Sequence, residues 1–216
     1  VSGSANELTT LAGNEGTSGD KVNLKADVLV TVNDGTATAA QLNKINAMTT
    51  ALVTATGITA LTGTAAELVT LINNEGDAGD KVNLDGDFAV TITNTPTEAQ
   101  LATIDAATTG TISYGSDNDV TVTDQSVTAS YLNTLDGDTT GTVNASAVTT
   151  ITGTASEIKT VYASSGISGL GDEVITLSAS SATAADLNTI NTATTGLVIA
   201  TAITDITGTV SAIATL

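Results

Sequence analysis

The sequence predicts a β-rich repeat solenoid in which each coil of about 29 residues carries one short helix. Three observations predict it. A phrase of the form Ser/Thr-x-x-x-Leu/Ile returns eight times along the 216 residues, most copies carry a helix-capping signature, and β-branched segments lie between them. An array of small α/β repeat domains is the alternative.

The repeat units begin near residues 4, 38, 64, 97, 128, 154, 183 and 209. They are of two kinds. One continues as Leu-Asn-x-Ile and ends in Thr-Thr-Gly, as over residues 187–196. The other leads twice into Asn-Glu-Gly-x-x-Gly-Asp-Lys-Val-Asn-Leu, over residues 14–24 and 74–84. We therefore expect residues 1–216 to form one continuous array that belongs to a longer chain or fibre, because stacked repeats normally need polar capping units at their ends.

A short helix is expected at the start of each unit. In five units a hydroxyl residue precedes Glu or Gln by three positions, which is a capping box. The pairs are Ser4/Glu7, Thr38/Gln41, Thr64/Glu67, Thr97/Gln100 and Thr154/Glu157. Apolar residues then recur three positions apart, as one face of a helix requires. We expect each helix to end after about two turns, where a glycine supplies a left-handed conformation.

Strands are expected between the helices. Residues 29–32, 90–93, 120–123 and 197–200 are β-branched and mostly alternate with Thr, and a second segment such as 147–152 or 202–207 precedes the next unit. Such a unit cannot bury its apolar face alone, so successive units must stack and pair their strands. Lys21 and Lys81 occupy matching positions, and we interpret them as surface ion pairs or loop anchors.

The composition is acidic and threonine-rich, and it excludes most enzyme chemistry. The chain has no Cys or His, so it offers neither a thiol nucleophile nor an imidazole base. Five basic residues against 23 acidic ones leave a net charge of −18, which repels nucleic acid and anionic membranes. No apolar stretch approaches the roughly 18 to 20 residues of a membrane-spanning helix. We predict that the protein is not an enzyme, binds no nucleic acid and does not insert into a membrane.

Acidic loops offer the one candidate site. Carboxylates flanked by glycine suit calcium, and weak sites would fill at extracellular calcium concentrations. The candidate ligands are Asp77, Asp80, Asp85, Asp87, Asp117, Asp119, Asp136 and Asp138. The alternative is that these residues simply form turns, because Asp-Gly and Asn-Asp favour them and no cluster has the spacing of an EF-hand.

Several motifs resemble repeats of very large secreted surface and adhesin-like proteins of marine cyanobacteria and other Gram-negative bacteria. They are Thr-Ala-Ala-Glu-Leu (64–68), Ile-Asp-Ala-Ala-Thr-Thr-Gly (104–110), Asp-Val-Thr-Val-Thr-Asp (119–124) and Leu-Asn-Thr-Leu-Asp-Gly (132–137). The last is also similar to cyanophage tail-fibre repeats. The resemblance implies a structural, adhesive or motility-associated role outside the cell, and no catalytic residues.

These observations predict a structural repeat protein of an extracellular filament or cell-surface fibre. Its partners would be further copies of itself, stacked end to end, or neighbouring repeats. One alternative is a calcium-dependent adhesin or binding module that holds glycans or cell surfaces. Another is a segment of a phage tail fibre.

Overall fold

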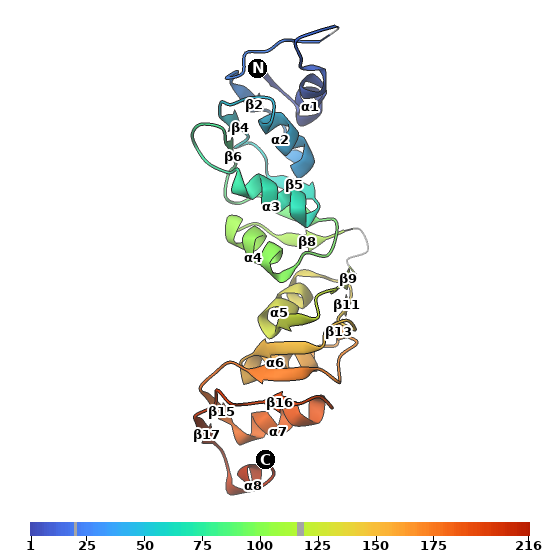
Figure 1. The fold of residues 1–216 in the computed structure, drawn as a ribbon, viewed down its shortest axis with the longest axis vertical. Helices are drawn as coiled ribbons and strands as arrows, with labels where there is room; N and C mark the ends of the chain where they lie inside the picture. The colour runs from blue at the N-terminus through green and yellow to red at the C-terminus, as the bar shows by residue number, and fades with distance from the viewer. Residues whose placement is uncertain (20, 116–118) are drawn as a thin grey trace. The chain divides into compact units, whose positions relative to one another are not determined.

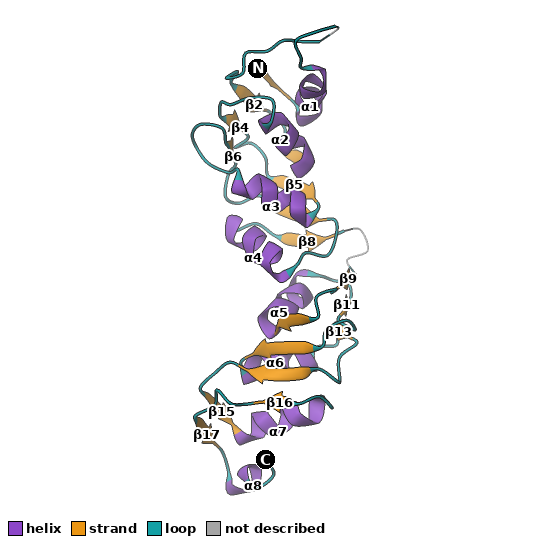
Figure 2. Cartoon of the chain, viewed as in Figure 1, coloured by secondary structure: helices purple, strands orange, loops and turns teal. Residues whose placement is uncertain are grey.

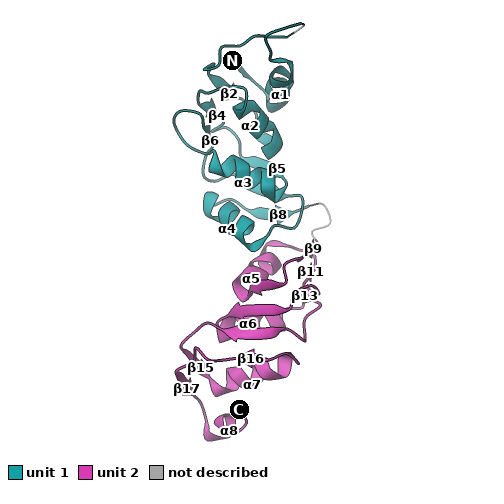
Figure 3. Cartoon of the chain, viewed as in Figure 1, with its two compact units in different colours: residues 1–115 teal, residues 116–216 magenta. Residues whose placement is uncertain are grey.

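The computed structural model describes residues 1–19, 21–115 and 119–216. The chain divides into two compact units, Val1–Gly115 and Ser116–Leu216 (Figure 3). Each unit has its own parallel sheets and its own row of helices, so each is described by itself.

Unit 1 alternates short strands and helices. Its elements are β1 (Ser2–Gly3), α1 (Ala5–Asn14), β2 (Val30–Val32), β3 (Thr36–Thr38), α2 (Ala39–Asn46), β4 (Val53–Thr54), β5 (Ala60–Gly63), α3 (Ala65–Asn73), β6 (Val82–Asn83), β7 (Ala89–Ile92), α4 (Glu98–Ala107) and β8 (Ile112–Tyr114). One sheet has the order β1-β2-β4-β6 and the other β3-β5-β7-β8. Helices α1 to α4 pack side by side in chain order (Figure 1).

Unit 2 repeats the same scheme. Its elements are β9 (Val120–Thr121), β10 (Ser126–Thr128), α5 (Ala129–Asp138), β11 (Val143–Asn144), β12 (Thr150–Gly153), α6 (Ala155–Ala163), β13 (Ile167–Ser168), β14 (Val174–Leu177), β15 (Ser181–Thr183), α7 (Ala184–Ala193), β16 (Val198–Ile199), β17 (Asp205–Thr207) and α8 (Val210–Ile213). Its sheets have the orders β9-β11-β13, β10-β12-β14-β16 and β15-β17.

The prediction of a β-rich solenoid, and with it the description as a β-helix, is wrong. The described residues form an α/β fold of eight helices and five sheets, every strand pair is parallel, and no sheet closes on itself (Figure 2). Every described helix except α8 makes two full turns or more, whereas no described strand is longer than β5. The β-branched segments misled the prediction because the strands they contain are only two to four residues long, shorter than helices α1 to α7; in 147–152, only the last three residues belong to β12.

The predicted helix starts are correct. All five capping boxes form, with the hydroxyl accepting from the amide of the third residue and that residue's side chain accepting from the cap. Thr128, Thr183 and Thr209 cap the other three helices through the hydroxyl. In α1 and α3 a residue of the following coil adds a further cap: Asp34 accepts from the amide of Ala5 at 2.6 Å, and Asn94 accepts from the amide of Ala65 at 2.8 Å.

The predicted left-handed glycine at the helix ends is wrong. Gly110 and Gly196 are absent from the glycines with positive φ, and a Cβ at these positions would lie 2.3 Å from the carbonyl oxygen of Phe88 and 2.2 Å from that of Glu173. The Thr-Thr-Gly motif instead forms a tight corner. Thr194 donates to the carbonyl of Glu173 at 2.8 Å and accepts from the amide of Gly196 at 2.9 Å. The motif therefore binds successive coils together, which explains why Thr194 is buried.

The coils have two lengths. In unit 2, Val143 of β11 pairs with Ile167 of β13. In unit 1, Val53 of β4 pairs with Val82 of β6, so this coil holds more residues between its paired strands. The extra residues lie in the connection between α3 and β6, which belongs to one of the two copies of the Asn-Glu-Gly motif. Sheet pairing therefore tolerates an expansion that is confined to a loop.

Candidate functional site

A groove of about 640 Å³ lies in unit 1 between the loop after α1, the end of α2 and the loop after α3. We call it the corner groove. Its lining is mainly asparagine and threonine, with one carboxylate from each loop and an apolar strip; Glu15, Leu24, Asn46, Met48, Thr70 and Asp80 mark its walls. Three successive coils thus contribute to one polar depression.

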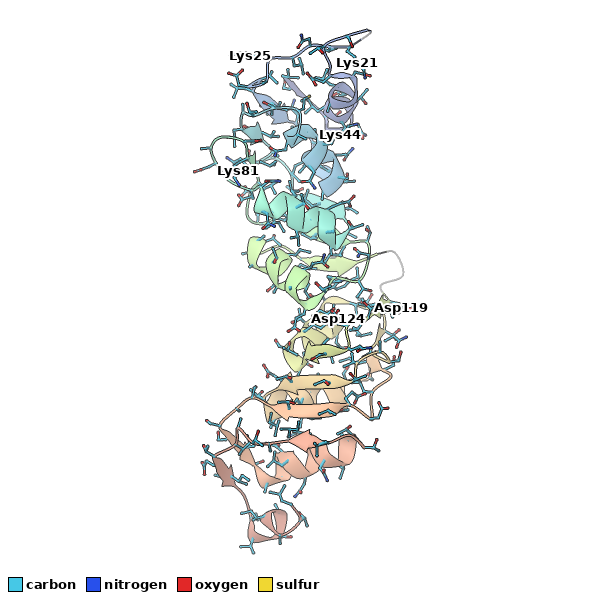
Figure 4. The ribbon with its side chains drawn as sticks, in the orientation of Figure 1. Lys21, Lys25, Lys44, Lys81, Asp119 and Asp124 are labelled. Carbon is cyan, nitrogen blue, oxygen red and sulfur yellow. The ribbon has the colours of Figure 1, made fainter. Side chains whose placement is uncertain are left out.

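The two loops beside the groove are copies of the Asn-Glu-Gly motif and fold alike. In each, a short parallel bridge joins the glutamate after the helix to a valine, Glu15 to Val22 and Glu75 to Val82. Lys81 donates to the carbonyl of Asn73 at 3.1 Å, and Lys21 makes the matching contact at the end of α1 (Figure 4). These lysines are loop anchors, as predicted, because a cation is favourable at the carboxyl end of a helix.

Two asparagines of α2 carry the unusual feature of the groove. Asn43 donates its Nδ2 to the carbonyl of Glu67 at 2.9 Å, which fixes the orientation of the amide. The side-chain oxygens of Asn43 and Asn46 are buried, and neither has a hydrogen-bond partner. Asn46 is only 9% exposed. A buried oxygen without a donor costs about 1–3 kcal/mol, so these oxygens favour a donor supplied from outside the protein.

The structure does not gather the predicted calcium ligands. Among the described residues, no three Asp, Glu, His or Cys side chains lie together in a way that could hold a metal ion. Asp77, Asp80, Asp85 and Asp87 are exposed. Asp117 lies outside the described residues. Calcium binding stays a prediction.

Asp85, Asp119 and Asp136 are held by hydrogen bonds within the fold. Asp119 accepts from the amide and the hydroxyl of Thr142 at 2.7 and 2.9 Å, and these two bonds hold its pKa below the usual value. Asp136 accepts from the hydroxyl of Ser164 at 2.7 Å. Asp85 accepts from the amide of Gly86 at 3.0 Å. These carboxylates serve turns and contacts between coils, as the alternative interpretation of the acidic loops expects.

Sequence reasoning missed a buried polar pair in unit 2. Glu173 is fully buried, and it accepts from the hydroxyl of Tyr162 at 2.7 Å and from the amide of Gly171 at 2.9 Å. Burial, followed by the bond to Glu173, raises the pKa of Tyr162. A comparison of two repeat copies could have identified this residue. Phe88 follows Asp87 in one copy and Glu173 follows Asp172 in the other, so a carboxylate occupies a position that is apolar in the first copy.

No described helix has the length and apolar character needed to cross a lipid bilayer. Comparison of the chain with protein families, with curated proteins and with solved structures found no match. The similarity to bacterial surface proteins therefore stays an expectation from the motifs, and the corner groove has to be interpreted from its own chemistry.

Proposed function

We propose that the protein is a non-enzymatic binding module that acts outside the cell and holds its ligand in the corner groove. The observation that carries the proposal is Asn46, a side chain that lines the groove, is almost fully buried and has an oxygen without a partner. The matching position of unit 2 holds Asp136, whose carboxylate has a donor in Ser164, so the repeat itself does not require an unpartnered oxygen at this position.

The loops that border the groove support the same proposal. Unit 2 pairs its strands with a connection of three residues between α6 and β13, whereas unit 1 uses eight residues between α3 and β6. Ordering the additional residues costs conformational entropy, about 1–2 kcal/mol for each backbone unit. The additional residues are not needed for sheet pairing, and they include Asn74 and Asp80 of the groove lining.

The chemistry of the buried acid argues for binding rather than catalysis. Glu173 is the one fully buried carboxylate among the described residues, and its oxygens accept from Tyr162 and Gly171. A general acid or base must reach a substrate within hydrogen-bond distance. Glu173 is enclosed by the protein's own groups, so we assign it to the fold of unit 2.

The test is binding of the purified chain to immobilised polymers: neutral, amino and acidic polysaccharides, and a protein surface, each with calcium and with a chelator. The matched variant replaces residues 74–81 with the three-residue sequence of 164–166, which makes the same connection in unit 2. We expect the wild-type chain to bind at least one polymer and the loop replacement to bind at least about tenfold more weakly while it stays folded.

Absence of binding to every polymer would overturn the proposed function. Equal binding by the wild-type chain and a folded loop replacement would remove the corner groove as the site. Binding that is lost with the chelator would support the calcium-dependent form of the module.

A further inference from the structure

We propose that the corner groove binds a saccharide, either neutral or carrying amino groups, and discriminates against acidic sugars. The inference rests on the proposed function, because it names the ligand class of the same groove. It follows from the hydrogen-bonding groups of the lining, the unpartnered side-chain oxygen of Asn46 and the charges on the two loops.

The lining presents the groups that a chain of hydroxyls requires. Amides of asparagine both donate and accept, and a sugar hydroxyl does the same, so the two surfaces are complementary at several points. Thr70 donates its hydroxyl to the carbonyl of Ala66 at 2.8 Å, which leaves its oxygen to accept from a ligand. The partly exposed side chains of Leu24 and Met48 give the groove an apolar strip for the C–H face of a sugar ring.

Asn46 points independently to a ligand that donates hydrogen bonds. Its oxygen has no partner, and the side chain lines the groove. That oxygen is closed to solvent and makes no bond in the free protein, so a turn of the side chain toward the groove would let it accept from a ligand hydroxyl or ammonium without giving up a bond of its own. Its counterpart in unit 2, Asp136, already has a donor in Ser164 at 2.7 Å. The unsatisfied acceptor is therefore a property of the position in unit 1, and not of every repeat.

The charges of the groove select between sugars. Glu15 and Asp80 line it from opposite loops, and the two nearby lysines Lys21 and Lys81 direct their ammonium groups to the helix carbonyls of Gly13 and Asn73. Among the described residues, the lining therefore carries two negative charges and no positive one. An acidic sugar is repelled there, and an amino sugar is attracted.

Calorimetric titration of the intact chain tests the inference with three probes, the tetrasaccharides of N-acetylglucosamine, glucosamine and galacturonic acid. We expect the first two to bind and the acidic one to bind at least about tenfold more weakly. Asn46→Leu removes the oxygen and keeps the side-chain size. We expect it to weaken binding by about tenfold or more without lowering the melting temperature, since no hydrogen bond of that oxygen is lost. Asn191→Leu, at the counterpart position on the exposed surface of α7, is the control and should bind as the wild type does.

A second pair of variants tests the charge argument. Glu15→Gln changes a carboxylate of the groove, and Glu75→Gln changes its counterpart, which makes the same type of backbone bridge but does not line the groove. We expect Glu15→Gln to reduce the preference for glucosamine over N-acetylglucosamine by about threefold and Glu75→Gln to leave it unchanged.

The outcomes separate this inference from the proposed function. If the chain binds a polymer through the groove, as the loop replacement reports, but none of the neutral or amino tetrasaccharides, the ligand class is wrong and the binding module stands. If it binds no polymer, both fail. An Asn46→Leu variant that binds normally, or that melts well below the wild type, overturns the inference, because Asn46 then serves no ligand or serves the fold.

Discussion

The corner after α3 in unit 1 and the corner after α6 in unit 2 occupy the same place in the repeat and differ in one respect. In unit 2 the connection is three residues long, and Ser164 at its start donates to Asp136 at 2.7 Å. In unit 1 the connection is eight residues long, and Asn46, which stands where Asp136 does, has no partner for its oxygen. At this position the short corner supplies a donor to its carboxylate, whereas the expanded corner leaves the oxygen of Asn46 without a partner beside a groove. The corner with the longer loop is thus the one that combines a groove with an unpartnered acceptor at this position.

The interiors of the two units also differ at a second position of the repeat, where unit 1 has an aromatic residue and unit 2 has a carboxylate. Phe88 is 2% exposed in unit 1, and Glu173 at the matching position of unit 2 is buried with Tyr162 as its donor. Thr108 and Thr194 donate to the carbonyls of these two residues, which shows that the backbones correspond. The backbone scheme thus accepts at this position either an aromatic ring or a carboxylate whose oxygens have donors.

The largest expected effect on stability concerns the tight Thr-Thr-Gly corner, which both units contain. Gly110→Ala in unit 1 and Gly196→Ala in unit 2 each place a Cβ within 2.3 Å of a backbone carbonyl oxygen. Relief requires a shift of the backbone between coils, so we expect each to lower the free energy of unfolding by about 3 kcal/mol. Gly137→Ala in α5, where a Cβ meets no atom within 4 Å, is the control and should be neutral or slightly stabilising. Urea denaturation measures all three, and wild-type stability of the first two would contradict the tight corner.

An intermediate effect on stability is expected when the hydrogen-bonded pair Tyr162 and Glu173 is changed. Tyr162→Phe removes the donor to Glu173 and should cost about 1–2 kcal/mol in denaturant unfolding. The double variant Tyr162→Ile with Glu173→Phe gives unit 2 the residues that unit 1 has at positions 72 and 88. Because Glu173 and its donor Tyr162 then disappear together and only the amide of Gly171 loses its acceptor, we expect the double variant to be more stable than Tyr162→Phe. A double variant less stable than Tyr162→Phe would show that the two interiors are not interchangeable.

The smallest effect concerns acid sensitivity, which both units share through their capping boxes. The amide and hydroxyl of Thr154 donate to Glu157 and hold its pKa below the usual value of 4.5, and Ser4 does the same for Glu7. A carboxylate with a lowered pKa in the folded state contributes stability above about pH 4.5, and this is lost as the pH falls through the lowered value. We expect the wild-type melting temperature to decrease from pH 6 to pH 3. The double variant Glu7→Gln with Glu157→Gln should decrease less, and an identical pH profile would contradict the assignment.

Local signals in the sequence predicted the local structure. Hydroxyl residues three positions before Glu or Gln located five helix starts, because a capping box is formed within one turn. Sheet content was overestimated because only two to four residues of each β-branched segment pair, and the pairing partner of each strand lies a whole coil away in the sequence. The fold class depended on those distant pairings, so the sequence pattern predicted the helix starts correctly and the β-rich class incorrectly.

The candidate site could be predicted only in part. The repeated Asn-Glu-Gly loops were visible as a motif, and Asp80 among the predicted calcium ligands does line the groove. Asn46 was not predictable, because its importance lies in the absence of a partner that Asp136 has in unit 2. A single asparagine near a helix end carries no such information in the sequence, where it resembles any other polar surface residue.

The caps supplied by Asp34 and Asn94 couple the coils during synthesis. The first amide of α1 receives its additional bond from a residue 29 positions downstream, and the first amide of α3 likewise. A nascent chain can form the turn of α1 early, but that helix is not complete until the following coil has left the ribosome and folded against it. These two helices are therefore completed only by a later part of the chain, and folding of α1 and α3 is expected to finish after the residues that follow them have been synthesised.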